Sequence, residues 1–244
     1  MKLTTVISSV NNNPHYYKFI PYQIKYWARF GANFKVVFCG DKIPDELNPY
    51  TDHIILWNRD LQLNDIYVAQ NIRMYYAGFC CADDEAVILT DMDLFPVNLD
   101  YYFRDLEKYN GDEFLVYYRG YETNQIYMCY NVAKPSTWRK LFKLTSLDDI
   151  SGLLRKYYPS NYSGVPGREG WYQDQLILYN AWEVYPSKVI LNRRPRRIEP
   201  WTLSQIIRDD SIEWKNFDDV HFHRDFIQYE QFVKKLDELM DKDQ

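Results

Sequence analysis

Short apolar runs alternate with longer segments of helical periodicity along the first hundred residues. The runs predict strands over Leu3–Val10, Phe34–Cys39, His53–Trp57 and Ala86–Thr90. The periodic segments predict helices over Tyr17–Phe30, which Gly31 would end, and from Asn64 or Asp65 through Phe79. Strands that alternate with helices are typical of a mostly parallel central sheet flanked by helices. We therefore expect an α/β fold.

The second half of the chain is less regular. Strands are predicted over Phe114–Tyr118, Ile126–Asn131 and Asp219–His223, and helices over Trp138–Phe142, Leu147–Tyr157, Asp174–Trp182 and Tyr229–Met240. A long Gly- and Pro-rich loop is predicted over Tyr158–Gly170, either as a lid over a ligand or as a plain connection. Because no linker or repeat separates the halves, residues 1–244 are interpreted as a single domain.

Two carboxylates directly follow the apolar run AVILT. Asp91 and Asp93 are one residue apart, and apolar residues flank the triplet on both sides. In parallel sheets, ligands bind beyond the carboxyl ends of the strands. Paired carboxylates there would repel unless a divalent cation such as Mg²⁺ or Mn²⁺ neutralised them, and such a cation keeps positions open for phosphate oxygens. The alternative is a solvated acidic turn, which the apolar flanks disfavour.

A second group of candidate metal ligands lies downstream in the sequence DDVHFHR. Asp219, His221 and His223 share one face of the predicted strand, and imidazole suits Mn²⁺ or Zn²⁺ better than Mg²⁺. Alternate residues on a strand are roughly 6.6 Å apart, so we expect only one of the two histidines to bind the metal directly. For either histidine alone, a surface or hydrogen-bonded role is the alternative.

Composition narrows the classes of function. The net charge of −5 and the pI of about 5.4 predict no broad basic face for nucleic acid. No apolar stretch is long enough for a membrane span or a signal-peptide core. The four cysteines form neither a CxxC pair nor a disulfide framework, so we expect a soluble protein in a reducing compartment, the cytoplasm. The run Arg193-Arg194-Pro195-Arg196-Arg197 is interpreted as a solvated loop, with phosphate or acidic-acceptor binding as the alternative.

Taken in order, these motifs resemble the GT-A class of metal-dependent nucleotide-sugar glycosyltransferases. VILTDMDLFP looks like the DxD strand of that class, and NIRMYYAGF, with Arg73, precedes it. MCYNVAKPSTW is similar to the segment that faces the donor sugar, and WYQDQLILYN to the Asp-Gln helix start of glycogenin-like and galactosyltransferase-like members. VHFHRDF looks like the late histidine metal motif. The chain is also similar to small soluble glycosyltransferases of large algal viruses, for which the location would be the host cytoplasm.

The resemblance implies a GT-A, Rossmann-like domain with a nucleotide-binding part over about residues 1–100 and an acceptor-binding part over about 101–244. It also implies the metal ligands. Asp93 would bind the metal directly, and Asp91 would bind the metal or the ribose. His221 would be the third ligand, with His223 as its substitute, and Arg73 would approach the phosphates or the sugar of the donor.

Other matching positions receive roles in the same way. Val6 and Ser8, at the end of the first strand, would line the base pocket. Asp174 and Gln175 would contact the donor sugar and the acceptor beside the reacting carbon. The alternative for Asp174 is a helix N-terminal carboxylate that the helix dipole stabilises. The sequence departs from the family where a small residue and a Lys usually follow the late histidine motif, and Arg224 would replace that cation.

The activity implied is transfer of a hexosyl or deoxyhexosyl group from a UDP-sugar to a carbohydrate or glycan acceptor, with Mn²⁺ or Mg²⁺ and with retention of configuration. Tyrosines near the expected site would stack on sugars in an acceptor groove: Tyr117, Tyr118, Tyr121, Tyr127, Tyr130, Tyr172 and Tyr179. Two other functions remain open. One is a haloacid-dehalogenase-type phosphatase with Asp91 as nucleophile, and the other is a non-catalytic sugar-binding protein whose acidic pair holds Ca²⁺.

Overall fold

A computed structural model of the chain describes residues 1–59, 61–109, 111–120, 124–198, 216–222, 230–231, 233–234 and 236–238. Its centre is a sheet with strand order β3-β2-β1-β4-β7-β6-β8. The strands are β1 (Lys2–Asn11), β2 (Asn33–Cys39), β3 (Ile54–Trp57), β4 (Glu85–Leu89), β6 (Phe114–Val116), β7 (Asn131–Ala133) and β8 (Lys188–Ile190). All neighbouring pairs are parallel except the two that β7 makes, with β4 and β6. The expected mostly parallel α/β sheet is confirmed.

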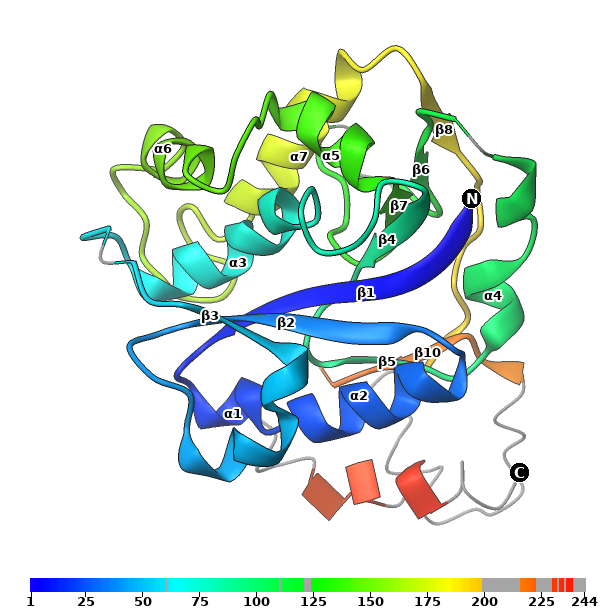
Figure 1. The fold of residues 1–244 in the computed structure, drawn as a ribbon, viewed down its shortest axis with the longest axis horizontal. Helices are drawn as coiled ribbons and strands as arrows, with labels where there is room; N and C mark the ends of the chain where they lie inside the picture. Colours follow the sequence, from blue (N-terminus) through cyan, green and yellow to red (C-terminus); the bar gives the residue numbers. More distant parts are fainter. Residues whose placement is uncertain are drawn as a thin grey trace.

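Helices cover both faces of this sheet (Figure 1). One face carries α3 (Asp65–Tyr76), α5 (Pro135–Phe142), α6 (Asp149–Lys156) and α7 (Gln173–Glu183), and the other carries α1 (Pro14–Tyr17) and α2 (Ile20–Arg29). The chain also contains the helix α4 (Leu99–Phe103) and the 3₁₀ segments Asp45–His53 and Leu106–Lys108. Residues 230–231, 233–234 and 236–238 are also helical, in agreement with the terminal helix predicted there. No helix within the described ranges has the length and apolar character that crossing a membrane requires.

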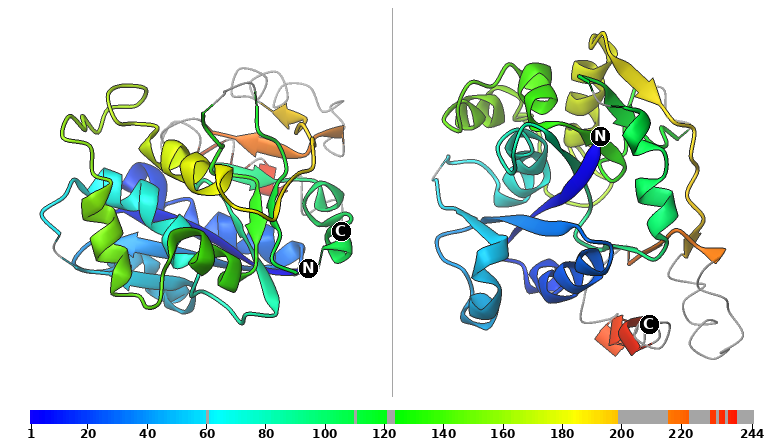
Figure 2. Two further views of the ribbon diagram at one scale, coloured as in Figure 1. Left: turned by 90° about the horizontal axis from the view of Figure 1, so that it is seen from above. Right: turned by 45° about the vertical axis from the view of Figure 1, so that its right-hand side comes forward.

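A second, small sheet joins segments that are far apart in the sequence. Its order is β5 (Leu94–Pro96), β10 (Asp219–His221) and β9 (Arg197–Ile198). The strand β10 runs antiparallel to β5, with His221 opposite Leu94, and parallel to β9, with Asp219 opposite Arg197. Figure 2 shows this sheet from two further directions. Because β5 directly follows the Asp91–Asp93 turn, the small sheet brings the late histidine segment to that turn.

Local chemistry accounts for the helix boundaries. The Asn64 side chain accepts a 2.9 Å hydrogen bond from the Ile66 amide, so of the two candidate caps, Asn64 and Asp65, it is Asn64 that caps α3. The predicted helix Tyr17–Phe30 corresponds to α2, which begins only at Ile20 because Pro21 lacks an N–H and is tolerated only in a first turn; Tyr17 instead ends α1. Gly31, with φ of 72°, ends α2 as expected, in a left-handed conformation that glycine adopts without steric cost.

The predicted strand Ile126–Asn131 is wrong in all but its last residue. The Asn131 side-chain amide donates to the carbonyls of Tyr127, at 2.6 Å, and Met128, at 3.2 Å, and so holds a turn before β7. Tyr130 has a φ of 140°, which an extended strand does not contain. The strand therefore begins only at Asn131.

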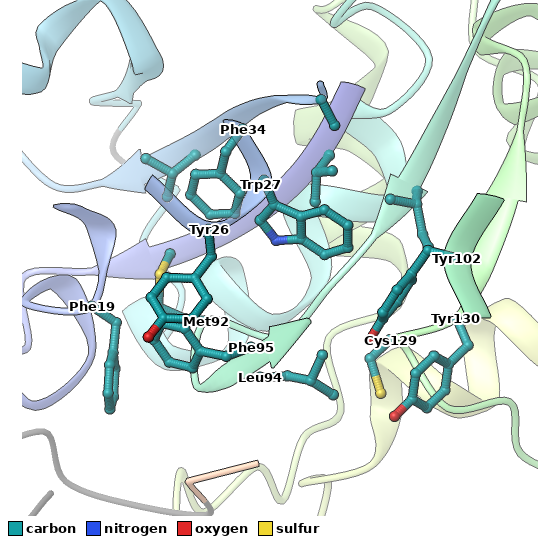
Figure 3. Close-up of a cluster of buried hydrophobic side chains, with 14 of the residues drawn as sticks. Phe19, Tyr26, Trp27, Phe34, Met92, Leu94, Phe95, Tyr102, Cys129 and Tyr130 are labelled. Atoms are coloured by element: carbon teal, nitrogen blue, oxygen red, sulfur yellow. The ribbon is translucent and has the colours of Figure 1, made fainter. Parts of the chain in front are cut away.

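Apolar side chains form one core on each face of the sheet. The core beneath α2 is rich in aromatic rings, and Figure 3 shows Tyr26, Trp27 and Phe95 within it. Phe95 contacts Phe19 and Tyr26 edge-on, with ring centroids 5.6 and 5.1 Å apart. The small sheet is thus fixed to the main domain by packing immediately next to the acidic turn.

Candidate active site

The acidic turn lies at the carboxyl end of β4, between β1 and β7 in the main sheet. The Asp93 side chain is 11% exposed, whereas the Asp91 side chain is 27% exposed. The Phe222 amide donates to the Asp93 carbonyl at 2.8 Å, and the Leu94 amide to that of Asp91 at 3.3 Å. Backbone hydrogen bonds therefore hold both carboxylates at the sheet edge where parallel sheets bind ligands.

Arg73 connects the acidic turn to the start of α7. Its guanidinium, on α3, donates to the Thr90 carbonyl at 2.8 Å, to Asp91 Oδ1 at 2.6 Å and to Asp174 Oδ2 at 3.4 Å. Burial disfavours the charge of Arg73, but Asp91 and Asp174 outweigh that cost and raise its pKa. Burial also raises the pKa of Asp91, but the nearby Arg73 and His221 lower it by more. The Arg73–Asp91 pair is therefore fully charged at neutral pH.

Asp174 is the buried carboxylate of this group. The residue is 4% exposed in the first turn of α7, and its Oδ1 accepts a 2.8 Å hydrogen bond from the Gln175 amide. Burial raises its pKa to about 6, although Arg73 opposes the shift, and the charge of Asp91 adds to it. Such a carboxylate is ionised at neutral pH yet takes up a proton just below it, which is the range useful for acid–base chemistry.

The second half of the site is the pair formed by Asp93 and His221. Asp93 Oδ1 lies 3.3 Å from His221 Nε2, and β10 presents the histidine because His221 is opposite Leu94 in the small sheet. Burial lowers the pKa of His221, but the Asp93 carboxylate more than compensates, so the net shift is upward. The small sheet thus places His221 beside Asp93, and metal binding by these two residues stays a prediction.

A buried network lies behind His221. Arg197, on β9, approaches His221 Nδ1 at 3.1 Å and pairs with Asp219 Oδ1 at 2.7 Å. Tyr130 hydrogen-bonds both Arg197 and Asp219. Because a guanidinium can only donate, His221 Nδ1 accepts, which assigns the ring proton of the neutral form to Nε2, facing Asp93.

These donors suit a divalent cation. A carboxylate oxygen and an imidazole nitrogen 3.3 Å apart can occupy neighbouring positions around one ion, whose bonds to such atoms are about 2.0–2.3 Å long. Asp91 is separated from Asp93 by Met92 alone, but its Oδ1 atom already pairs with Arg73. The described residues include no cluster of three or more His, Cys, Asp or Glu side chains arranged around a metal position. Two residues, Asp93 and His221, therefore fit a divalent cation. His221 can bind it through Nε2 only if the ring proton moves from Nε2 to Nδ1, the nitrogen that Arg197 contacts.

Comparison with known proteins gives matches at the level of structure. LgtC, solved as an active-site mutant, matches with a TM-score of 0.50 at 14% identity, over 90% of this chain and 87% of LgtC. The glycosyltransferase GlyE of Streptococcus pneumoniae TIGR4 matches with a TM-score of 0.51 at 14% identity. That match covers 91% of this chain, which spans 55% of the GlyE chain. No family model matches the chain, and no curated protein matches it by sequence.

The chain has a GT-A glycosyltransferase fold. In this GT-A domain the acidic turn, Arg73, Asp174 and His221 meet at the carboxyl edge of the sheet. LgtC has also been solved as a galactosyltransferase with donor and acceptor sugar analogs, a match with a TM-score of 0.48 at 13% identity. The structural matches to LgtC and GlyE establish the common fold, and because the sequence identities are low, the reaction has to be proposed from the site itself.

Val6 and Ser8 do not lie at the end of the first strand, where they were expected. The strand β1 continues to Asn11, and both residues are fully buried inside it. The Ser8 hydroxyl has no hydrogen-bond partner among the described residues. The apolar run Leu3–Val10 predicted a strand that ends before Asn11. The polar residue Asn11 also belongs to β1, so Val6 and Ser8 lie further from the strand end than expected. Contact with a nucleotide base stays a prediction for both.

Several other expectations can now be placed. Gln175 directly follows Asp174, and its Oε1 atom is buried without a hydrogen-bond partner among the described residues. His223 and Arg224 lie outside the described residues, so their expected roles remain predictions. The four cysteines are free, as expected from their spacing. No role at the site was predicted for Cys129, yet its buried thiol helps to lower the pKa of Asp91.

The tyrosines expected in an acceptor groove divide into different classes. Tyr117 and Tyr130 are core residues, 0% and 2% exposed, so their expected exposure to a sugar is wrong. Tyr172 is 43% exposed, and Tyr121 lies outside the described residues. The remaining three are partly buried: Tyr118, Tyr127 and Tyr179. The apolar run Phe114–Val116 directly before Tyr117 indicated a buried strand, and Tyr117 continues its burial.

The arginine run was also misinterpreted in part. The Arg197 side chain is 19% exposed and forms the network behind His221, and Arg193 is 11% exposed. Arg193 donates to the Arg104 carbonyl at 2.7 Å. The interpretation as a solvated loop is thus wrong for these two arginines, and nothing in the local sequence distinguishes them from the exposed Arg194 and Arg196.

Proposed function

We propose that the chain transfers a sugar from a UDP-sugar to a glycan acceptor. The observation that supports this best is the Arg73 bridge, which holds the acidic turn after β4 beside Asp174 at the start of α7. In a GT-A fold these two segments come together where a nucleotide-sugar donor would lie. The Arg73 guanidinium would thereby connect a phosphate-binding region at the acidic turn with a sugar-binding region at the start of α7.

At the diphosphate end, the site must neutralise the charge that develops on the leaving nucleotide. Asp93 and His221 would hold Mn²⁺ or Mg²⁺, with Asp91 contacting the metal or the ribose. The bound metal would supply electrostatic stabilisation of the diphosphate. Arg73 adds a fixed positive charge beside Asp91, at 2.6 Å, inside a buried environment where such charges act strongly.

At the sugar end, Asp174 and Gln175 provide a carboxylate and an unsatisfied amide oxygen. A sugar hydroxyl that donates to Gln175 Oε1 would satisfy an acceptor that is buried without a partner among the described residues, a state that costs about 1–3 kcal/mol. The ionised Asp174 carboxylate would stabilise positive charge that develops at the anomeric carbon. We propose retention of configuration, with Asp174 as the stabilising group, and a hexosyl or deoxyhexosyl group as the transferred sugar.

A panel of UDP-sugars tests this proposal. Each is incubated with the protein and Mn²⁺, and release of UDP is measured with and without a metal chelator. We expect metal-dependent hydrolysis of at least one UDP-sugar, lost in Asp93→Asn and kept in Asp84→Asn. Asp84 is an exposed aspartate in the turn before β4, so it is a matched control for the substitution.

The same preparations distinguish the other two functions. Hydrolysis of a phosphate monoester through a covalent phosphoaspartate at Asp91 would establish the phosphatase. Calcium-dependent sugar binding without UDP release from any donor would establish the sugar-binding protein. Either result would replace the transferase proposal.

A further inference from the structure

A polar hollow lies on the other side of the β9–β10 strand pair from Asp93 and His221. Its volume is about 770 Å³, and it is bounded by α4, the Leu106–Lys108 turn and the connection from β8 to β9. Successive side chains on a strand point to opposite faces. Accordingly, Arg197 and Asp219 contact each other beside His221, whereas Arg196 and Asp218 pair at 2.8 Å and line the hollow.

The hollow carries an excess of positive charge although the chain is acidic. Among the described residues, its lining holds five cations and three carboxylates: Arg104, Lys108, Arg193, Arg194 and Arg196 against Asp100, Asp105 and Asp218. Asp105 alone faces three of the cations, with Lys108 Nζ at 2.6 Å and nitrogens of Arg193 and Arg104 at 3.5 and 4.0 Å. This local excess of two positive charges contrasts with the net charge of −5 of the whole chain. A dianion would therefore complement the lining.

The walls of the hollow are held in place before any ligand binds. Tyr101 donates to the Arg193 carbonyl at 3.0 Å, and Arg193 donates to the Arg104 carbonyl at 2.7 Å, which ties the β8–β9 connection to α4. Asp105 and Asn192, one on each wall, have φ of 64° and 54°. Left-handed conformations in residues other than glycine carry an energetic cost and cluster at ligand sites.

We propose that this hollow binds a saccharide that carries a phosphate monoester. The phosphate is a dianion near neutral pH and would pair with Arg104, Lys108 and Arg194. The amides of Asn98 and Asn192 line the same space and suit sugar hydroxyls. A volume of about 770 Å³ is in the range of small-molecule sites, and a lone phosphate would leave most of it to water. This site is separate from the proposed transfer reaction and does not depend on it.

Calorimetric titration of the full chain with glucose 1-phosphate and glucose 6-phosphate tests the proposal. We expect at least one to bind, at least tenfold more tightly than inorganic phosphate or glucose. The double variant Arg104→Gln/Lys108→Gln should weaken binding at least tenfold. It should fold normally, since the two side chains are 53% and 65% exposed. Arg155→Gln, an exposed arginine on α6, is the matched control and should bind as the unaltered chain does.

Three results would overturn the proposal. They are no binding of either sugar phosphate, equal binding by the double variant, or equal affinity for inorganic phosphate. Asp93→Asn separates this site from the proposed donor site, because it should leave sugar-phosphate binding unchanged while abolishing UDP-sugar hydrolysis. Loss of sugar-phosphate binding in Asp93→Asn would place the ligand in the donor site and would also contradict a separate hollow.

Discussion

At the scale of single residues, two arginines organise the charge of the site. Arg73 lies between Asp91 and Asp174, and Arg197 lies between Asp219 and His221. Arg73 offsets the repulsion between Asp91 and Asp174, and Arg197 neutralises the buried Asp219 carboxylate, each in a poorly solvated environment. The positive charges are therefore part of the fold as well as of the proposed chemistry.

Removing the Arg197 charge should destabilise the protein strongly. In Arg197→Met, the fully buried Asp219 carboxylate would lose its cation, and we expect a loss of about 3–5 kcal/mol in the free energy of unfolding. Urea denaturation measures this loss. Arg104→Met is the control, because its pair with Asp100 is exposed and such pairs contribute about 0.3–0.5 kcal/mol. Equal effects of the two substitutions would contradict the role of Arg197.

The raised pKa of Asp174 predicts a pH dependence of turnover. Below a pKa of about 6 the carboxylate is protonated, so UDP-sugar hydrolysis should fall about tenfold for each further pH unit. The folded-state pKa lies above the ordinary 3.8, so the contribution of Asp174 to stability is complete below pH 3.8 and is lost as the pH rises through about 6. The rate is measured between pH 4.5 and 8, and a rate that is constant down to pH 4.5 would contradict this assignment.

At the scale of elements, the turn before β7 depends on one buried side chain. Asn131 is 0% exposed, and its amide donates to two carbonyls within that turn. Asn131→Ala should therefore lower the free energy of unfolding by about 1–3 kcal/mol, since those carbonyls lose their buried partner. Thermal and urea denaturation measure the loss. Asn180→Ala, at an exposed position of α7, should change stability by no more than about 0.5 kcal/mol.

The sequence was most informative where one local rule determined an element. The apolar run before Asp91 predicted β4, and the Asn64 cap predicted the start of α3, because both signals lie within a few residues. The short strands β5 and β9 were not predicted, since they form only through pairing with β10, more than twenty residues from β9 and more than a hundred from β5. The same long-range pairing determines the environment of Arg197, which a local pattern cannot show.

For the site, the motif order located the chemistry and the structure specified the contacts. Asp93 and His221 were expected near one another, and they lie 3.3 Å apart. The Arg73–Asp174 contact joins residues that are 101 positions apart, and neither residue type nor spacing predicts it. Polar networks of this kind depend on tertiary placement, so they follow from the sheet order more than from any single segment.

At the scale of the whole molecule, the sheet order explains how the site forms. The strand β4 lies in the middle of the sheet, α3 and α7 cover one face, and the small sheet brings β10 to the acidic turn (Figures 1 and 2). The charged side chains of this GT-A fold thus converge at the carboxyl ends of the strands. The central claim is that this edge binds a nucleotide together with a divalent cation.

Calorimetric titration of UDP into the protein with and without Mn²⁺ tests that claim most directly. We predict that UDP binds in the presence of Mn²⁺, that chelation of the metal weakens binding at least tenfold, and that Asp93→Asn does the same. Asp84→Asn should bind as the unaltered chain does, which excludes a general effect of lost negative charge. UDP binding that is absent, or that is unchanged by both chelation and Asp93→Asn, would contradict the account.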